Sequence, residues 1–364
     1  MFTAKVSGKS KSASLKTAVA LLALLFLVIP GSGLLSIDLS QASGDRWHND
    51  RDDDHDNDWK RPRFCSQTAQ AAFRACGNEV KDDHWIAVGN CINVSDDEER
   101  EDCFNDAKNG EDGYRAAKEE CKDQFEARRE VCEDLGEDRY DPQVTPADFD
   151  DPQPNPYYPL VPGTTWTYVN DEAGETINVE VLSEIKVIEY PADSGQEFNC
   201  IVVSDVVTET ESGDDIEVTL DWYAQDNAGN VWYFGEIAQN FEDGELVDIE
   251  GSWKAGVDGA KPGILMWAYT GFGSEPPQEV YRQEFFLGDA EDIGEFVGWE
   301  SSITVGGITY SNVLKTKDST PIEPGVFEFK FYAPGVGLIL EEAYEDEVAN
   351  GETVELFSSS LPLP

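Results

Sequence analysis

Apolar and polar positions follow different patterns in the two halves of the chain. Residues 64–137 are rich in Ala, Glu, Lys and Arg with regularly placed cysteines, which is typical of helices. Residues 157–364 contain short runs of β-branched and aromatic side chains separated by Gly- and Asn-containing turns. The pattern therefore predicts a helical region followed by an all-β domain.

The strand-like runs are short and follow one another closely, which indicates antiparallel meanders. No long helical segments alternate with them, so a parallel sheet is not expected. We predict an α+β, multidomain chain whose β domain is mainly antiparallel and forms a curved sheet, a half-barrel or a sandwich. The main runs are residues 165–169, 177–190, 198–209, 216–225, 230–236, 279–287, 326–333 and 337–344.

The segments outside these two regions have other compositions. Residues 1–42 begin with several lysines and continue with the apolar stretch Ala18–Ile29, which is too short to span a bilayer comfortably and predicts a signal peptide. We therefore expect an exported protein, periplasmic or extracellular, without a membrane span. Residues 43–63 predict a disordered acidic linker, and residues 138–156 a Pro/Asp-rich linker.

The cysteines of the helical region indicate a hairpin. The interval from Cys65 to Cys76 equals the interval from Cys121 to Cys132, and each is about three helical turns. Ser95 with Glu98 forms a capping-box pattern at the turn. The spacing favours nested disulfides, although six cysteines allow many pairings. Such a hairpin is either a rigid interaction arm or a small helical pair that needs stapling. The predicted bridges are Cys65–Cys132, Cys76–Cys121 and Cys91–Cys103.

The charge of the chain limits its partners. It has 26 Lys and Arg against 74 Asp and Glu, a net charge of −48. Such a chain repels nucleic acid and anionic lipid, so neither is an expected partner. The aspartates around His48 and His55 would bind a divalent cation weakly, or would form a solvated linker. An EF-hand is excluded because the glycine and glutamate positions of its loop hold Trp59 and Cys65.

Several catalytic chemistries lack their residues in the β domain. No histidine follows His84, which excludes a Ser-His-Asp triad or a His-ligated zinc site there. Cys200 lies in an apolar run and predicts a buried, inert thiol. No glycine loop that could hold phosphate opens a helix, so we expect no cofactor. Carboxylates are too numerous to identify a glycosidase pair.

Four segments of the β domain have distinctive sequences: residues 157–168, 221–236, 251–266 and 331–342. They resemble a family of secreted bacterial proteins of unknown function. The cysteine-rich hairpin is also similar to the one that precedes the β domain in that family. The resemblance covers most of the mature chain and implies no known activity. The opening PLVPGTTWTY and the closing YAPGVGL more loosely resemble curved-sheet envelope proteins related to lipoprotein carriers.

Two features of the β domain indicate a binding site. Aromatic pairs on neighbouring strands cannot all face one core, because successive side chains point to opposite faces. Basic residues are scarce from Asn155 onward, and some lie in or near a Gly-rich loop. The alternatives are a covered, two-sided core and internal ion pairs. The candidate ligand-binding residues are Trp222, Tyr223, Trp232, Tyr233, Lys254, Lys261, Tyr281 and Arg282.

These features favour an exported, non-catalytic binding protein for a small apolar molecule, a glycan or an envelope or extracellular partner. One alternative is an extracellular glycosidase that uses a pair of carboxylates. Another is an acidic structural surface protein bridged by cations.

Overall fold

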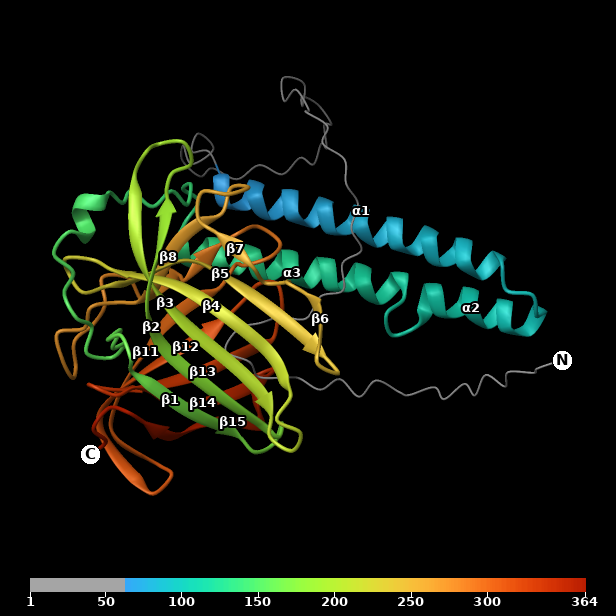
Figure 1. The fold of residues 1–364 in the computed structure, drawn as a ribbon. Helices are drawn as coiled ribbons and strands as arrows, with labels where there is room; N and C mark the ends of the chain where they lie inside the picture. The colour runs from blue at the N-terminus through green and yellow to red at the C-terminus, as the bar shows by residue number, and fades with distance from the viewer. Residues whose placement is uncertain (1–62) are drawn as a thin grey trace, which may run out of the picture.

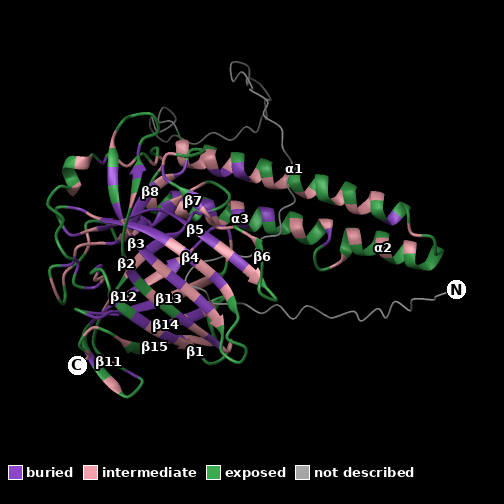
Figure 2. Cartoon of the chain, in the orientation of Figure 1, coloured by how far each residue is buried: buried purple, intermediate pink, exposed green. Residues whose placement is uncertain are grey.

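The computed structural model describes residues 63–364, and it consists of a helical hairpin against a large β-barrel (Figure 1). The predicted signal peptide and residues 43–62 of the predicted acidic linker, with His48 and His55, lie outside the described residues. The helices run away from the barrel and most of their surface is exposed, whereas the buried residues concentrate in the strands (Figure 2).

The hairpin is held together mainly by its disulfides. Its longest helix buries only Ala69, Ala72 and Cys91, so it has almost no hydrophobic core and depends on cross-links for stability. The predicted pairing is confirmed, with Cα–Cα distances of 5.6, 5.8 and 5.5 Å for Cys65–Cys132, Cys76–Cys121 and Cys91–Cys103. The helices are α1 (Phe64–Ile92), α2 (Asp97–Asn109) and α3 (Tyr114–Leu135).

The second arm of the hairpin is divided into two helices. Its first helix is capped by Asp96 and not, as the capping-box pattern predicted, by Ser95. The Asp96 carboxylate accepts hydrogen bonds from the backbone N–H groups of Glu98 and Glu99 at 2.9 and 3.1 Å, and a carboxylate also interacts favourably with the helix dipole. At Gly110 a Cβ atom would lie 2.7 Å from the carbonyl oxygen of Asp106, so the tight turn between α2 and α3 requires glycine.

The β domain is one antiparallel sheet of 15 strands in the order β10-β8-β5-β4-β3-β2-β1-β15-β14-β13-β12-β11-β9, with β6 and β7 paired to β5. The predicted fold class is confirmed, and the sheet is a nearly closed barrel. The strands are β1 (Thr165–Asn170), β2 (Glu175–Glu189), β3 (Glu197–Glu209), β4 (Asp215–Gln225), β5 (Val231–Glu242), β6 (Glu245–Asp248), β7 (Trp253–Lys254), β8 (Lys261–Met266), β9 (Val280–Arg282), β10 (Glu284–Phe285), β11 (Ile293–Val305), β12 (Ile308–Ser319), β13 (Val326–Ala333), β14 (Gly337–Glu345) and β15 (Val348–Ser359).

The two ends of the strand order are joined by the chain itself. β9 pairs with β11 and β10 pairs with β8, and only Gln283 separates β9 from β10. The closing segment, residues 282–285, therefore carries the chain from one edge of the sheet to the other. It passes so close to β8 that a Cβ atom on Gly263 would lie 2.4 Å from the carbonyl oxygen of Arg282.

The Pro/Asp-rich segment between hairpin and barrel packs along the barrel wall. It contains the 3-10 helix η2 (Pro146–Phe149), whose Phe149 ring lies edge-on to Phe198 and Phe234 at 5.3 and 5.9 Å. Asn155 is buried and donates hydrogen bonds to the carbonyl oxygens of Gly229 and Trp267 at 2.9 and 3.0 Å. The segment therefore covers part of the outer face of the sheet.

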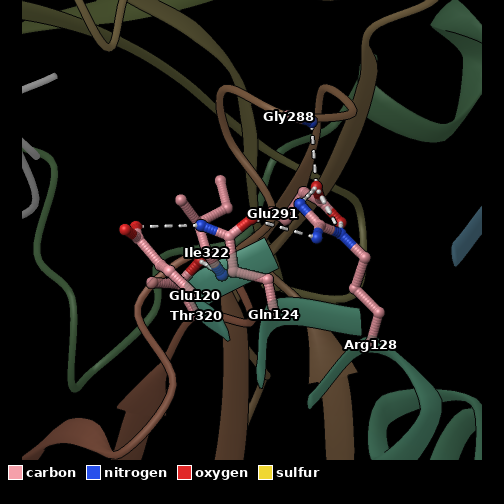
Figure 3. A network of polar contacts seen from close by, with 7 residues as sticks. All are labelled: Glu120, Gln124, Arg128, Gly288, Glu291, Thr320 and Ile322. Carbon is pink, nitrogen blue, oxygen red and sulfur yellow. Dashed lines mark hydrogen bonds and ion pairs between the residues drawn. The ribbon is translucent and has the colours of Figure 1, made fainter. Parts of the chain in front are cut away.

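A buried ion pair attaches the hairpin to the barrel. Arg128 of α3 points at Glu291, which lies between β10 and β11 (Figure 3). Arg128 Nη2 lies 2.7 Å from Glu291 Oε1, Nε lies 3.0 and 3.1 Å from the two carboxylate oxygens, and both side chains are buried. The backbone N–H of Gly288 also donates to Glu291 Oε1 at 2.9 Å. The carboxylate thus has several partners, which offset the cost of burying the charges.

We expect Glu291→Gln to lower the free energy of unfolding by about 3–5 kcal/mol, because it leaves the Arg128 guanidinium buried and uncompensated. The matched control is Glu133→Gln, which removes the exposed partner of Arg129 at 3.8 Å on the same helix. It should change stability by about 1 kcal/mol or less. Urea denaturation, with tryptophan fluorescence as the signal, measures the free energy of unfolding of both variants. Equal losses of stability in the two variants would show that the buried pair does not hold the hairpin.

Candidate functional site

The barrel encloses a cavity of about 90 Å³ whose wall is unusually acidic. Carboxyl groups from β3, β4, β5, β10 and β12 and from Asp292 just before β11 reach it, together with a single lysine, Lys330 of β13. The other lining side chains are mainly tyrosines and apolar residues. The carboxyl groups belong to Asp205, Asp221, Glu236, Glu284, Asp292 and Asp318, and the tyrosines are Tyr158, Tyr168, Tyr223, Tyr233 and Tyr332.

The strand period places these carboxyl groups inside the barrel. In β3 the residues Val203, Asp205 and Val207 alternate with outward-facing positions, and all three are buried. In β4 and β5 the cross-strand partners Asp221 and Glu236 are both buried as well. An acidic side chain within an apolar inward row therefore points into the interior of the barrel.

Lys330 is shared among several carboxylates. Its Nζ lies 3.1 Å from Asp318, 3.5 Å from Glu328 and 4.0 Å from Glu341. Burial lowers the pKa of Lys330, but attraction to Asp318, Glu341 and Glu328 outweighs this effect and raises the pKa overall. The side chain is therefore a buried ammonium group, and it neutralises one negative charge.

The cavity carboxyl groups otherwise interact with neutral side chains and with one another, since Glu284 shares a hydrogen bond with Asp292, which also accepts one from Thr320. The Tyr233 hydroxyl donates to Asp221 Oδ1 at 2.6 Å, and Gln283 Nε2 donates to Asp318 Oδ2 at 3.1 Å. Within residues 63–364, Asp205 Oδ1 and Glu284 Oε2 are buried and have no hydrogen-bond partner. Burying a polar atom without a hydrogen-bond partner is costly, so these two oxygens can accept hydrogen bonds from a ligand.

Burial raises the pKa of the carboxyl groups in and around the cavity. Desolvation raises the pKa of Asp221 to about 6, that of Asp292 to about 7 and that of Glu341 to about 8. For Asp205, desolvation followed by repulsion from Asp221 raises the pKa well above its ordinary value. The cavity is therefore partly protonated near neutral pH, and a cation entering it would displace protons.

Two of the predicted site residues line this cavity and two others line a separate cleft. Tyr223 and Tyr233 face the interior, with ring centroids 4.8 Å apart. Lys261 and Arg282 line a cleft between the hairpin and the barrel. The structure therefore divides residues that the sequence grouped into one site.

The other predicted site residues line neither space. Trp222 is buried on the outer face, where Lys186 Nζ lies 4.6 Å from its ring centroid. The indole N–H of Trp232 donates to Asp226 at 3.0 Å. Tyr281 is buried against Trp267, and Lys254 is exposed. Both faces of the aromatic strands are thus covered, as the alternative of a two-sided core expected.

The interior carboxyl groups were not singled out from the sequence. A usable signal was present, because Asp205 and Lys330 share a strand face with apolar or aromatic residues: Asp205 with Val203 and Val207 in FNCIVVSDVV, and Lys330 with Tyr332 in FEFKFYA. A charged residue at an inward position of such a run indicates a polar interior. The chain has so many acidic residues that composition alone hides this signal.

No protein-family model matches the chain, and no curated protein matches it. Two solved structures are similar. One is a "putative lipoprotein" from Parabacteroides distasonis ATCC 8503, with 13% identity and a TM-score of 0.31 over 57% of this chain and 100% of that chain. The other is a "putative exported protein with YmcC-like fold" from Bacteroides fragilis NCTC 9343, with 14% identity and a TM-score of 0.32 over 56% of this chain and 98% of that chain. Similarity at this level carries no inference about function.

Two further observations concern the described residues. None of the helices in residues 63–364 is long and apolar enough to cross a membrane. In the same residues, no group of three or more His, Cys, Asp or Glu side chains could hold a metal ion. The three disulfides indicate an oxidising, extracytoplasmic compartment.

We expect stability to fall as the pH rises from about 5 to about 8. The cavity carboxyl groups ionise in the unfolded chain near pH 4 but only at about pH 6–8 in the fold, so the folded state binds more protons in this window. Between its pKa in the unfolded chain and its pKa in the fold, each such group lowers the free energy of unfolding by about 1.4 kcal/mol per pH unit.

Glu341→Gln should therefore stabilise the protein at about pH 8 and flatten the pH dependence, because its pKa is raised to about 8. The control is Glu345→Gln, an exposed position on the same strand, which should change neither the stability nor its dependence on pH. Urea denaturation across this pH range measures the effect. Stability that rises with pH in this window would contradict the assignment of protonated interior carboxyl groups.

Proposed function

We propose that this chain is an exported, non-catalytic binding protein that holds a small organic cation inside its barrel. The observation that carries the proposal is the excess of buried carboxyl groups over the single Lys330 in the cavity, with Asp205 Oδ1 and Glu284 Oε2 unpartnered. A positively charged ligand would supply the missing hydrogen bonds and charge compensation together.

The donor arrangement favours an organic cation over a metal ion. The carboxyl groups come from several different strands, and within residues 63–364 no three of them are grouped as metal ligands. The tyrosine rings of the wall add the negative ring faces that attract organic ammonium and guanidinium groups. Carboxylates combined with aromatic rings are suited to an amine or a guanidinium compound.

The size of the cavity sets the size of the ligand. At about 90 Å³ it is smaller than the cavity of about 150 Å³ that holds benzene in a well-studied case. The ligand therefore has few heavy atoms. An apolar molecule would leave the carboxyl groups unpartnered, and a glycan chain does not fit. The same limit disfavours the glycosidase alternative, which needs room for a sugar between two carboxylates.

The test compares guanidinium with urea, which have nearly the same shape and differ in charge. We expect calorimetry in about 0.15 M salt, where surface attraction is screened, to detect binding of guanidinium and none of urea. Asp205→Asn and Glu284→Gln should each weaken guanidinium binding by about tenfold or more, as expected for the loss of a hydrogen bond to a charged group.

The control is Glu245→Gln, which removes one negative charge from an exposed position of β6. It should leave guanidinium binding unchanged. If urea binds as well as guanidinium, or if Glu245→Gln weakens binding as much as Asp205→Asn does, the cation is attracted only by the overall charge and the proposal fails.

A further inference from the structure

A second cavity lies outside the barrel, where the base of the hairpin meets the closing segment. This junction cleft has a volume of about 550 Å³, within the range of about 300–1,000 Å³ that is usual for ligand sites. Its walls come from α1, α3, the segment that follows the hairpin, and the barrel. The side chains used below are Phe64, Arg128, Arg139, Lys261, Arg282 and Phe285.

The junction cleft concentrates positive charge in a chain of net charge −48. Only eight basic residues follow Gly136, and three of them line this cleft: Arg139, Lys261 and Arg282. Arg128 of α3 lines it as well. The lining contains three acidic residues, Asp138, Asp258 and Glu291. The local balance is therefore slightly positive, opposite in sign to the rest of the molecule.

Two of these cations already have partners. Arg128 is engaged by Glu291, and Lys261 Nζ donates to the carbonyl oxygen of Tyr140 at 2.6 Å and to Asp141 at 3.2 Å. Arg139 and Arg282 differ, because neither forms a direct ion pair within residues 63–364, and Arg282 has only a longer-range attraction to Glu291. The guanidinium carbon of Arg139 lies 4.0 Å from the ring centroid of Phe64.

Arg282 is the most unusual of the four. Only 9% of its side chain is exposed, and its guanidinium carbon lies 4.9 and 5.5 Å from the ring centroids of Phe285 and Tyr140. In the described part of the chain its Nη1 has no hydrogen-bond partner. A buried guanidinium group with an unused donor is costly, and an incoming anion would remove that cost.

We propose that the junction cleft binds a small organic anion, a carboxylate attached to an apolar or aromatic group. Arg282 and Arg139 pair with the carboxylate, and the rings of Phe64 and Phe285 contact the apolar part. The strong negative charge of the whole molecule disfavours polyanions such as nucleic acid, so the ligand is small and carries few charges. This inference is independent of the cation proposed for the barrel.

The test uses benzoate as the probe and benzamide as its neutral counterpart of similar shape. We expect calorimetry of the full secreted chain in about 0.15 M salt to detect benzoate and not benzamide. Arg282→Gln should weaken benzoate binding by about tenfold or more. Lys254→Gln removes an exposed lysine that lines neither cavity and should leave the affinity within about twofold.

Arg282 is buried, so a second variant guards against misfolding. Arg139→Gln changes an exposed position and should fold normally while still weakening benzoate binding. Three results would overturn the proposal: no benzoate binding up to about 10 mM, equal binding of benzamide, or a loss in Lys254→Gln as large as in Arg139→Gln. Each of these differs from the outcomes of the guanidinium experiment, because the two probes carry opposite charges.

Discussion

The closure of the antiparallel sheet is the constraint on which the rest of this structure depends. Once residues 282–285 join the two edges, the strands of the main strand order have one face turned to the interior of a nearly closed barrel. Strand alternation then decides which side chains are enclosed, and in this chain they include Asp205, Asp221 and Glu236. Enclosure removes water from these groups, which raises their pKa values and leaves oxygens without partners. The acidic cavity follows from closure and from the position of each carboxyl group along its strand.

The closing segment also separates two regions of opposite charge. Gln283 and Glu284 line the barrel interior, whereas Arg282 and Phe285 line the junction cleft. The hairpin completes the cleft because the Arg128–Glu291 pair holds α3 against this end of the barrel. The helical region is therefore more than a disulfide-linked hairpin attached to the barrel. Its base forms one wall of a candidate site, and the disulfide Cys65–Cys132 holds that base together.

Local patterns predicted much of the fold. The cysteine intervals determined the hairpin because facing positions on antiparallel helices are evenly spaced, and the pairing of Cys76 with Cys121 followed. Barrel closure was not predictable, because it depends on the pairing of two very short strands around Gln283. The grouping of Tyr223 and Arg282 into one site failed for the same reason, since Tyr223 lines the interior whereas Arg282 of the closing segment lines the junction cleft. The cap at Asp96 was missed because Ser95 and Asp96 are adjacent and both are good N-cap residues.

The central claim is that the barrel interior holds carboxyl groups whose protons a cation replaces. Its most direct test is calorimetry of guanidinium binding near pH 7 in two buffers of different ionisation enthalpy, which reports the protons exchanged on binding. The account predicts proton release, because the cation favours the ionised forms of carboxyl groups whose pKa values burial has raised to about 6–8. Equal heats in the two buffers, or proton uptake, would contradict it.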